Sequence, residues 1–158
     1  MNRRSQESAL ITSDIPLFWA AYDKAIATAP GGPGRDLRQR VSQAHSCLKE
    51  GSADFVGKLT AGRLLERVEA LHRWGNAQEK QLWEEFQKEM HGTNTRRWLY
   101  GGSETAERPV DMGYYVGYKI TDAYWKTQRD KTQALRTIFT ITDPKAFLEA
   151  SRYGEKFC

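Results

Sequence analysis

Cysteine is scarce in this sequence, with only Cys47 and Cys158 among 158 residues. Two cysteines define neither a disulfide framework nor a cysteine-based metal motif, so they leave the redox compartment open. Long apolar runs are also missing, since no stretch approaches the ~20 residues needed to cross a bilayer. No apolar segment follows Arg3 and Arg4 as it would in a signal peptide. We therefore expect no membrane span and, by default, a cytoplasmic location.

Familiar catalytic and nucleotide-binding motifs are absent as well. The sequence contains no GxGxxG, GxxxxGK[ST] or GxSxG pattern. Its three histidines, His45, His72 and His91, form neither HExxH nor HxxxH, so no histidine pair on one helical face can bind zinc. The net charge is +4, but the basic residues are dispersed among acidic ones. This dispersed charge argues against nucleic-acid binding, and a basic helical nucleic-acid-binding module is kept only as a lesser alternative.

The apolar residues of the sequence recur mostly at three- and four-residue steps, as in helices, and almost no segment alternates apolar and polar residues as a strand does. The sequence predicts a mainly α fold, a compact helical domain of about six to seven helices. Residues 1–10 are expected to be a disordered lead, and residues 11–158 a single helical domain with a Gly/Pro break at 30–36. The expected helices span residues 14–29, 37–62, 64–75, 77–90 and 109–125, followed by two that begin near 130 and 143. Residues 98–100 form either a packed loop or a three-residue strand.

Three aspartates stand where helices are expected to begin. Asp111 follows Pro109 and can cap the helix after it. Asp130 has Gln133 three residues later, the spacing of a capping box. Asp143 precedes Pro144, and proline is favoured at the first helical position.

The segment 109–125 organises the rest of the chain. Its expected buried face consists of Met112, Val116, Ile120, Ala123 and Tyr124. Gly113 and Gly117 each cost about 1 kcal/mol relative to alanine inside a helix. This cost is explained if another backbone packs closely against them, or if Gly113 only marks a loose first turn. Tyr114 and Tyr118 lie on an adjacent face. They are either core residues with satisfied hydroxyls or donors directed into a cleft.

Glu50 and Asp54 are the acidic pair with the clearest chemical potential. They are four residues apart and share one face of a helix. Such a pair can supply a metal ligand and a second acid that orients it, or it can be a solvated acidic edge beside Lys49 and Lys58. His72 lies on or beside an apolar helical face, where a satisfied core histidine is the default expectation.

Several segments together resemble a family of predicted zinc-dependent proteases of the domain-of-unknown-function type. They are EGSADFVGKLTAG at 50–62, GYYVGYKITDAYW at 113–125, DKTQALRTIFTITDPKAFLEASRY at 130–153 and DIPLFWAAYDKA at 14–25. The resemblance covers residues 11–29 and 47–153 and implies a mainly helical, zincin-like metallopeptidase. In that family two histidines of HExxH and a later glutamate would hold zinc, and the glutamate of HExxH would activate water. By this resemblance Glu50 is the third zinc ligand, Asp54 a supporting acid, and Tyr114 and Tyr118 cleft-wall residues.

The chain departs from this family where the HExxH helix should lie, between Lys24 and His45. We therefore expect a truncated or degenerate relative without catalytic activity of its own, acting as a binding module. The missing layer is expected to expose apolar surface from Phe18, Trp19, Phe55 or Trp98 for self-association or a protein partner. The alternative is a working zinc metallopeptidase, acting on a peptide substrate, in which Glu50, His45 and His72 assemble a nonstandard site.

Overall fold

The computed structural model describes residues 42–101 and 108–158, which form six α-helices and one short 3-10 helix, with no β-strand among them. These elements are α3 (Gln43–Ala61), α4 (Glu66–Ala77), α5 (Glu79–Glu89), α6 (Met112–Thr127), α7 (Lys131–Phe139), α8 (Pro144–Ser151) and η1 (Tyr153–Phe157). This confirms the mainly α fold class. The predicted lead, the helix at 14–29 and the Gly/Pro break at 30–36 lie outside the described residues.

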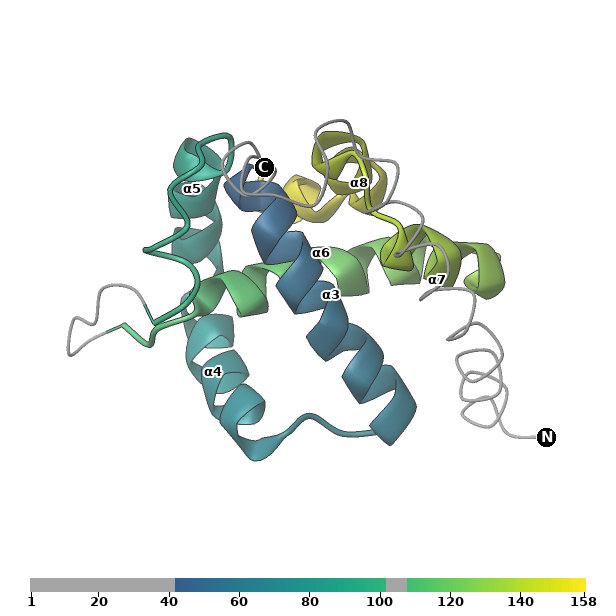
Figure 1. Ribbon diagram of the computed structural model, residues 1–158, viewed down its shortest axis with the longest axis horizontal. Coiled ribbons are helices and arrows are strands. Elements are labelled where there is room, and N and C mark those ends of the chain that lie inside the picture. Colours follow the sequence, from purple (N-terminus) through teal and green to yellow (C-terminus); the bar gives the residue numbers. More distant parts are fainter. Residues whose placement is uncertain (1–41, 102–107) are drawn as a thin grey trace, which may run out of the picture.

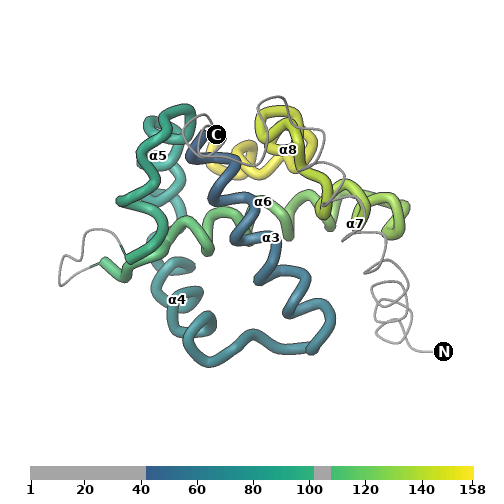
Figure 2. The backbone as a smooth tube through the Cα atoms, in the orientation of Figure 1, coloured from purple at the N-terminus to yellow at the C-terminus, as the bar shows by residue number. Residues whose placement is uncertain are grey.

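Helix α6 lies across the middle of the molecule, and the other helices are arranged around it (Figure 1). Helix α3 crosses α6, α4 and α5 lie towards one end of α6, and α7 and α8 lie towards the other (Figure 1). After α3 the chain returns through α4 and α5 before it enters α6, then continues through α7 and α8 to η1 (Figure 2). The segment 109–125 therefore has the central place that its apolar pattern predicts.

Glycines make the crossing of α3 and α6 unusually close. A Cβ atom added to Gly51 would lie 2.1 Å from the backbone nitrogen of Tyr118, and one added to Gly117 would lie 1.9 Å from the carbonyl oxygen of Cys47. A Cβ at Gly113 would lie 2.6 Å from the Cys47 sulfur. Real Cβ atoms do not approach other atoms this closely, so the two backbones touch only because side chains are missing there. This confirms the close packing predicted for Gly113 and Gly117.

Helices α4 and α5 differ in their bounds from the expected ones. Helix α4 continues past Gly75 to Ala77, so the predicted stop at Gly75 was wrong. Gly75 instead makes room for α6, since a Cβ there would lie 2.7 Å from the ring of Tyr115. The apolar spacing of the segment 77–90 predicts that Leu82, Trp83, Phe86 and Met90 are buried. Leu82, Trp83 and Phe86 are buried on α5, and Met90 is only partly buried.

The predicted caps of the last two α-helices are confirmed, and the predicted cap of α6 is not. Asp130 Oδ1 accepts a hydrogen bond from the Gln133 amide at 3.0 Å, and Asp143 Oδ1 accepts one from the Ala146 amide at 3.0 Å. Asp111 has a left-handed backbone, with φ of 63°, and makes no side-chain cap bond to α6. Its carboxylate instead accepts a hydrogen bond from the Gly101 amide at 2.8 Å. The reason is the left-handed turn, which directs the Asp111 side chain back to the preceding loop.

The expected exposure of Phe55 and Trp98 was wrong. Phe55 is 4% exposed and Trp98 is fully buried. Residues 98–100 form a packed loop rather than a strand, and the Trp98 ring packs edge-on against Phe86 with centroids 5.1 Å apart. Leu65 and Tyr100 are the large apolar side chains exposed among the described residues. Phe18 and Trp19 lie outside that part of the chain.

Candidate functional site

The crossing of α3 and α6 also determines which polar side chains meet. Gly51 lies directly on the α6 backbone, so Glu50 and Asp54 occupy the flank of α3 that borders α6. Tyr114 and Tyr118 lie one turn apart on α6. The result is two adjacent groups of side chains, one around Glu50 and one around Tyr118.

The carboxylate of Glu50 lies among tyrosine hydroxyls. Tyr100 donates to Glu50 Oε1 at 3.4 Å, and the hydroxyl of Tyr114 lies close enough to Glu50 for this carboxylate to raise the pKa of Tyr114. Burial and the nearby negative charge of Glu50 raise the pKa of Tyr114 to about 12, so its hydroxyl stays protonated at neutral pH. Tyr100, with φ of 65°, and Gly101, with φ of 68°, form a left-handed turn that brings the Tyr100 side chain to Glu50. The sequence did not predict Tyr100 as a partner, since it lies 50 residues from Glu50.

Asp54 lies one turn after Glu50 and is partly buried. Burial raises its pKa, the positive charge of Arg67 lowers it, and the negative charge of Glu50 raises it, with an increase overall. Arg67 lies in the first turn of α4, so the attraction between Asp54 and Arg67 acts between α3 and α4. Asp54 is therefore a partly shielded carboxyl group between two helices rather than a fully solvated edge.

Tyr118 is the centre of the second group. Its ring packs edge-on against His72, with centroids 4.4 Å apart, and against Phe55, with centroids 5.7 Å apart. Lys58 Nζ lies 5.7 Å from the centroid of this ring, and interaction with the Tyr118 hydroxyl is the main cause of the raised pKa of Lys58. Both Tyr114 and Tyr118 thus have a charged side chain near their hydroxyls. The cleft-wall role that the resemblance implies for them stays a prediction.

The histidines do not gather around Glu50. His45 is near the start of α3, where its backbone amide donates to Ser42 Oγ at 3.3 Å, and burial and Lys49 lower its pKa. His72 is on α4 between the rings of Tyr115 and Tyr118, and His91 is exposed after α5. Within residues 42–101 and 108–158, no group of three or more His, Cys, Asp or Glu side chains could hold a metal ion. The described part of the chain therefore does not present a complete zinc site from Glu50, His45 and His72.

Two further polar clusters were missed by sequence reasoning. In the first, Glu79 Oε1 accepts from the Tyr153 hydroxyl at 2.9 Å and from Lys156 Nζ at 2.5 Å, and it forms an ion pair with Lys119 Nζ at 3.3 Å. In the second, Glu85 accepts from Arg108 at 2.6 Å and from Arg97 at 2.8 Å. Both clusters join residues that are far apart along the chain, so no local spacing signals them.

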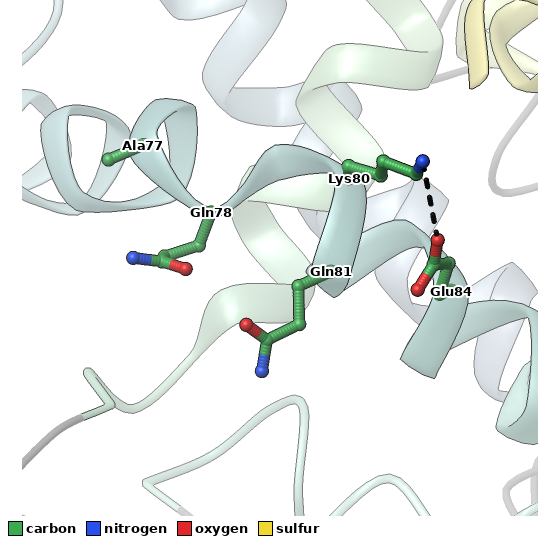
Figure 3. A pocket seen from close by; sticks show the side chains of 5 residues that line it. All are labelled: Ala77, Gln78, Lys80, Gln81 and Glu84. Atoms are coloured by element: carbon green, nitrogen blue, oxygen red, sulfur yellow. Dashed lines mark ion pairs between the residues drawn. The ribbon is translucent and has the colours of Figure 1, made fainter.

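A shallow surface hollow lies at the junction of α4 and α5. It is lined by Ala77, Gln78, Lys80, Gln81 and Glu84 (Figure 3). Lys80 and Glu84 form an exposed ion pair at 4.0 Å beside it. Its side chains are those of an ordinary solvated helix surface, so the hollow does not add a reactive group to the site.

No helix in the described residues has the length and apolar character of a membrane span.

Comparison with known proteins supports the resemblance found in the sequence. A family model described as "Predicted Zn-dependent protease (DUF2268)" matches residues 39–149. No curated protein and no solved structure matches the chain. The matched region contains α3 to α7 and most of α8, and with them Glu50, Asp54, Tyr114 and Tyr118. The chain is therefore a member of this family of predicted zinc-dependent proteases.

Proposed function

We propose that this chain is a binding module built on the helical scaffold of its family, without peptidase activity of its own. The observation that supports this most directly is the environment of Glu50. The carboxylate that the family resemblance makes a zinc ligand accepts a hydrogen bond from Tyr100 at 3.4 Å and lies beside the hydroxyl of Tyr114. Phenol hydroxyls that donate to a carboxylate satisfy the same lone pairs that a metal ion would use. In this chain Glu50 therefore joins α3 to α6 and to the 98–101 loop.

The sequence supports the same proposal. A catalytic zinc in a peptidase is held by three protein ligands and activates water with the help of a general base. The chain has three histidines, and none stands in HExxH. The described residues do not fit a zinc ion at Glu50, and we derive no catalytic step through one.

A protein or peptide partner is the occupant we propose for this module. Tyr100 is 68% exposed at the edge of the Glu50 group, and aromatic side chains with one polar end are common anchors in protein interfaces. Phe55 and Trp98 are buried and cannot form the expected partner surface. The proposed surface is therefore the edge around Tyr100. Self-association through it is one form that such binding can take.

Zinc binding and peptidase activity test the proposal together. The purified chain is dialysed against trace zinc, its metal content is measured by plasma mass spectrometry, and cleavage of an unfolded protein is followed by gel electrophoresis. We expect no stoichiometric zinc and no cleavage above that of a Glu50→Gln variant. Glu69→Gln is a matched control, because Glu69 is an exposed glutamate on α4.

The alternative is a working zinc metallopeptidase, and the family description favours it. In that case Glu50 is one ligand, and histidines such as His45 and His72 complete a nonstandard site with it across a dimer. Stoichiometric zinc in the wild type, lost in Glu50→Gln and kept in Glu69→Gln, would establish this alternative and overturn our proposal.

A further inference from the structure

His72 occupies an unusual position for a histidine, because it is buried without a hydrogen-bond partner for one of its ring nitrogens. The residue is 7% exposed, and its Nε2 atom is buried and unpartnered. Its ring packs edge-on against Tyr118, with centroids 4.4 Å apart, and against Tyr115, with centroids 5.2 Å apart. A neutral imidazole is compatible with two aromatic neighbours, but an imidazolium needs acceptors or anions to replace its lost water.

The charged groups that face His72 are mainly positive. Lys58 on α3 and Lys119 on α6 both disfavour a charge on the imidazole, and Asp122 on α6 is the anion that favours it. Tyr115 and Tyr118, also on α6, are protonated and neutral at and below neutral pH, because burial raises both of their pKa values. A proton added to His72 would therefore place a third positive charge beside two lysines in a largely buried location.

His72 is one of only two residues of helix α4 that bury a side chain. The buried residues of α4 are Val68, His72 and Gly75, and Gly75 has no side chain to pack. The helix has no side-chain cap at its N-terminus and no basic residue in its last turn. Apart from His72, Asn76 holds α4 on α6, because its Oδ1 accepts from the Tyr115 hydroxyl at 3.0 Å and from Lys119 Nζ at 3.3 Å. Loss of the His72 packing therefore weakens the contact between the two helices without removing it.

We propose that His72 makes the contact between α4 and α6 acid-sensitive, so that this contact weakens and α4 opens more often at mildly acidic pH while the α3–α6 crossing stays intact. This device is independent of zinc and of the function proposed above. Burial, followed by Lys119 and Lys58, lowers the pKa of His72 from 6.5 to about 4. Below pH 6.5 the His72 side chain binds a proton when α4 is open, but it stays neutral while it is packed against α6. The contact therefore weakens as the pH falls from about 6.5 towards 4. At pH 5.5 this linkage corresponds to about a tenfold loss in the equilibrium constant for packing.

Amide hydrogen exchange measured by mass spectrometry at pH 7.5 and 5.5, corrected for intrinsic rates, tests the local character of this change. We expect protection in α4 to fall by about tenfold at pH 5.5, while α3 and α6 keep theirs. In a His72→Gln variant the pH dependence of α4 should disappear. His91→Gln is the matched control, because His91 is exposed, and it should behave as wild type.

The titration of the wild-type histidines gives a second readout that does not depend on any variant. Proton NMR should show the His72 ring titrating well below the ordinary histidine pKa of 6.5, and Lys58→Gln should move the pKa of His72 upward. An ordinary pKa for His72, or a fall in protection that is equal in all helices, would overturn the proposal. An unchanged pH dependence of α4 in His72→Gln would overturn it as well.

Discussion

At the scale of single residues, the absence of a side chain at certain glycines is what allows helices α3 and α6 to pack closely. Gly51 and Gly117 let two helix backbones touch, and this contact places Glu50 next to Tyr114. Gly57 on the same helix α3 has nothing within 4 Å of the position that a Cβ would take. The three glycines therefore look alike in the sequence but differ in what they contribute.

Replacing Gly117 with alanine should strongly destabilise the fold. The added Cβ would lie 1.9 Å from a backbone oxygen, and no side-chain rotation can relieve a contact with backbone. We expect a loss of about 3 kcal/mol or more in the free energy of unfolding, at the upper end of what overpacking costs. Urea denaturation followed by circular dichroism measures it.

Gly57→Ala is the matched control for this substitution. Because it adds helix propensity at an open position, it should raise the free energy of unfolding by roughly 0.5–1 kcal/mol. Equal stability of the Gly117→Ala variant and the wild type would show that α3 and α6 do not cross as closely as described.

At the scale of elements, local signals account for the N-terminal starts of α7 and α8 but not for the start of α6. Asp130 and Asp143 each bond an amide three residues ahead, and that bond depends only on neighbouring residues. Asp111 has the same residue type before a helix, yet its carboxylate bonds to Gly101. Its left-handed backbone is part of the turn that positions the 98–101 loop, so a tertiary requirement overrides the local preference.

Asp130→Ala should remove the N-terminal cap of α7. We expect the free energy of unfolding to fall by about 1 kcal/mol, because the Gln133 amide loses its acceptor. Thermal unfolding of Asp130→Ala and Asp130→Ser gives the comparison, since serine can still accept this hydrogen bond. If both variants lost the same stability, the capping bond would not be the cause.

At the scale of the whole molecule, the last residues of the chain close the structure against α5 and α6. Tyr153 packs edge-on against Trp83, with centroids 5.2 Å apart, and donates to Glu79. Burial raises the pKa of Glu79, but hydrogen bonds from Lys156 and Tyr153 and the charge of Lys119 outweigh it, and the pKa is lowered overall. This cluster thus contributes stability above the ordinary glutamate pKa of 4.5, and that stability is lost as the pH falls through the lowered value.

Tyr153→Phe should weaken this closure while keeping the aromatic packing. The variant loses one hydrogen bond to a carboxylate, for which we expect about 1.5–3 kcal/mol in the free energy of unfolding at pH 7. The deficit should shrink in acid, as Glu79 becomes protonated in both proteins. Urea titrations at pH 7 and pH 3.5 measure both effects.

A surface ion pair provides the contrast for the Glu79 cluster. Glu149 pairs with Lys145 at 3.9 Å, and both side chains are largely exposed. Glu149→Gln should therefore change stability by less than about 0.5 kcal/mol. A loss in Glu149→Gln as large as in Tyr153→Phe would mean that the Glu79 cluster has no special role in closing the fold.

The candidate site could be predicted only in part. Helical spacing put Glu50 and Asp54 on one face of α3, and family resemblance singled out Tyr114 and Tyr118. Tyr100 could not be found in this way, because its contact with Glu50 depends on a left-handed turn far along the chain. His72 was expected to be a satisfied core residue, and its burial was correct, but its unpartnered nitrogen depends on which groups α3 and α6 bring to it.

The amino-acid sequence by itself determined the fold class, the central place of residues 109–125, the caps of α7 and α8 and the family of the chain. These features depend on residues close together in the chain, on helical periodicity and on the order of short motifs. Only the tertiary structure decided that Phe55 and Trp98 are buried, that tyrosine hydroxyls lie beside Glu50 and that His72 faces two lysines. Burial and charge pairing result from contacts between distant segments, and these contacts follow from the angle and closeness at which whole helices pack.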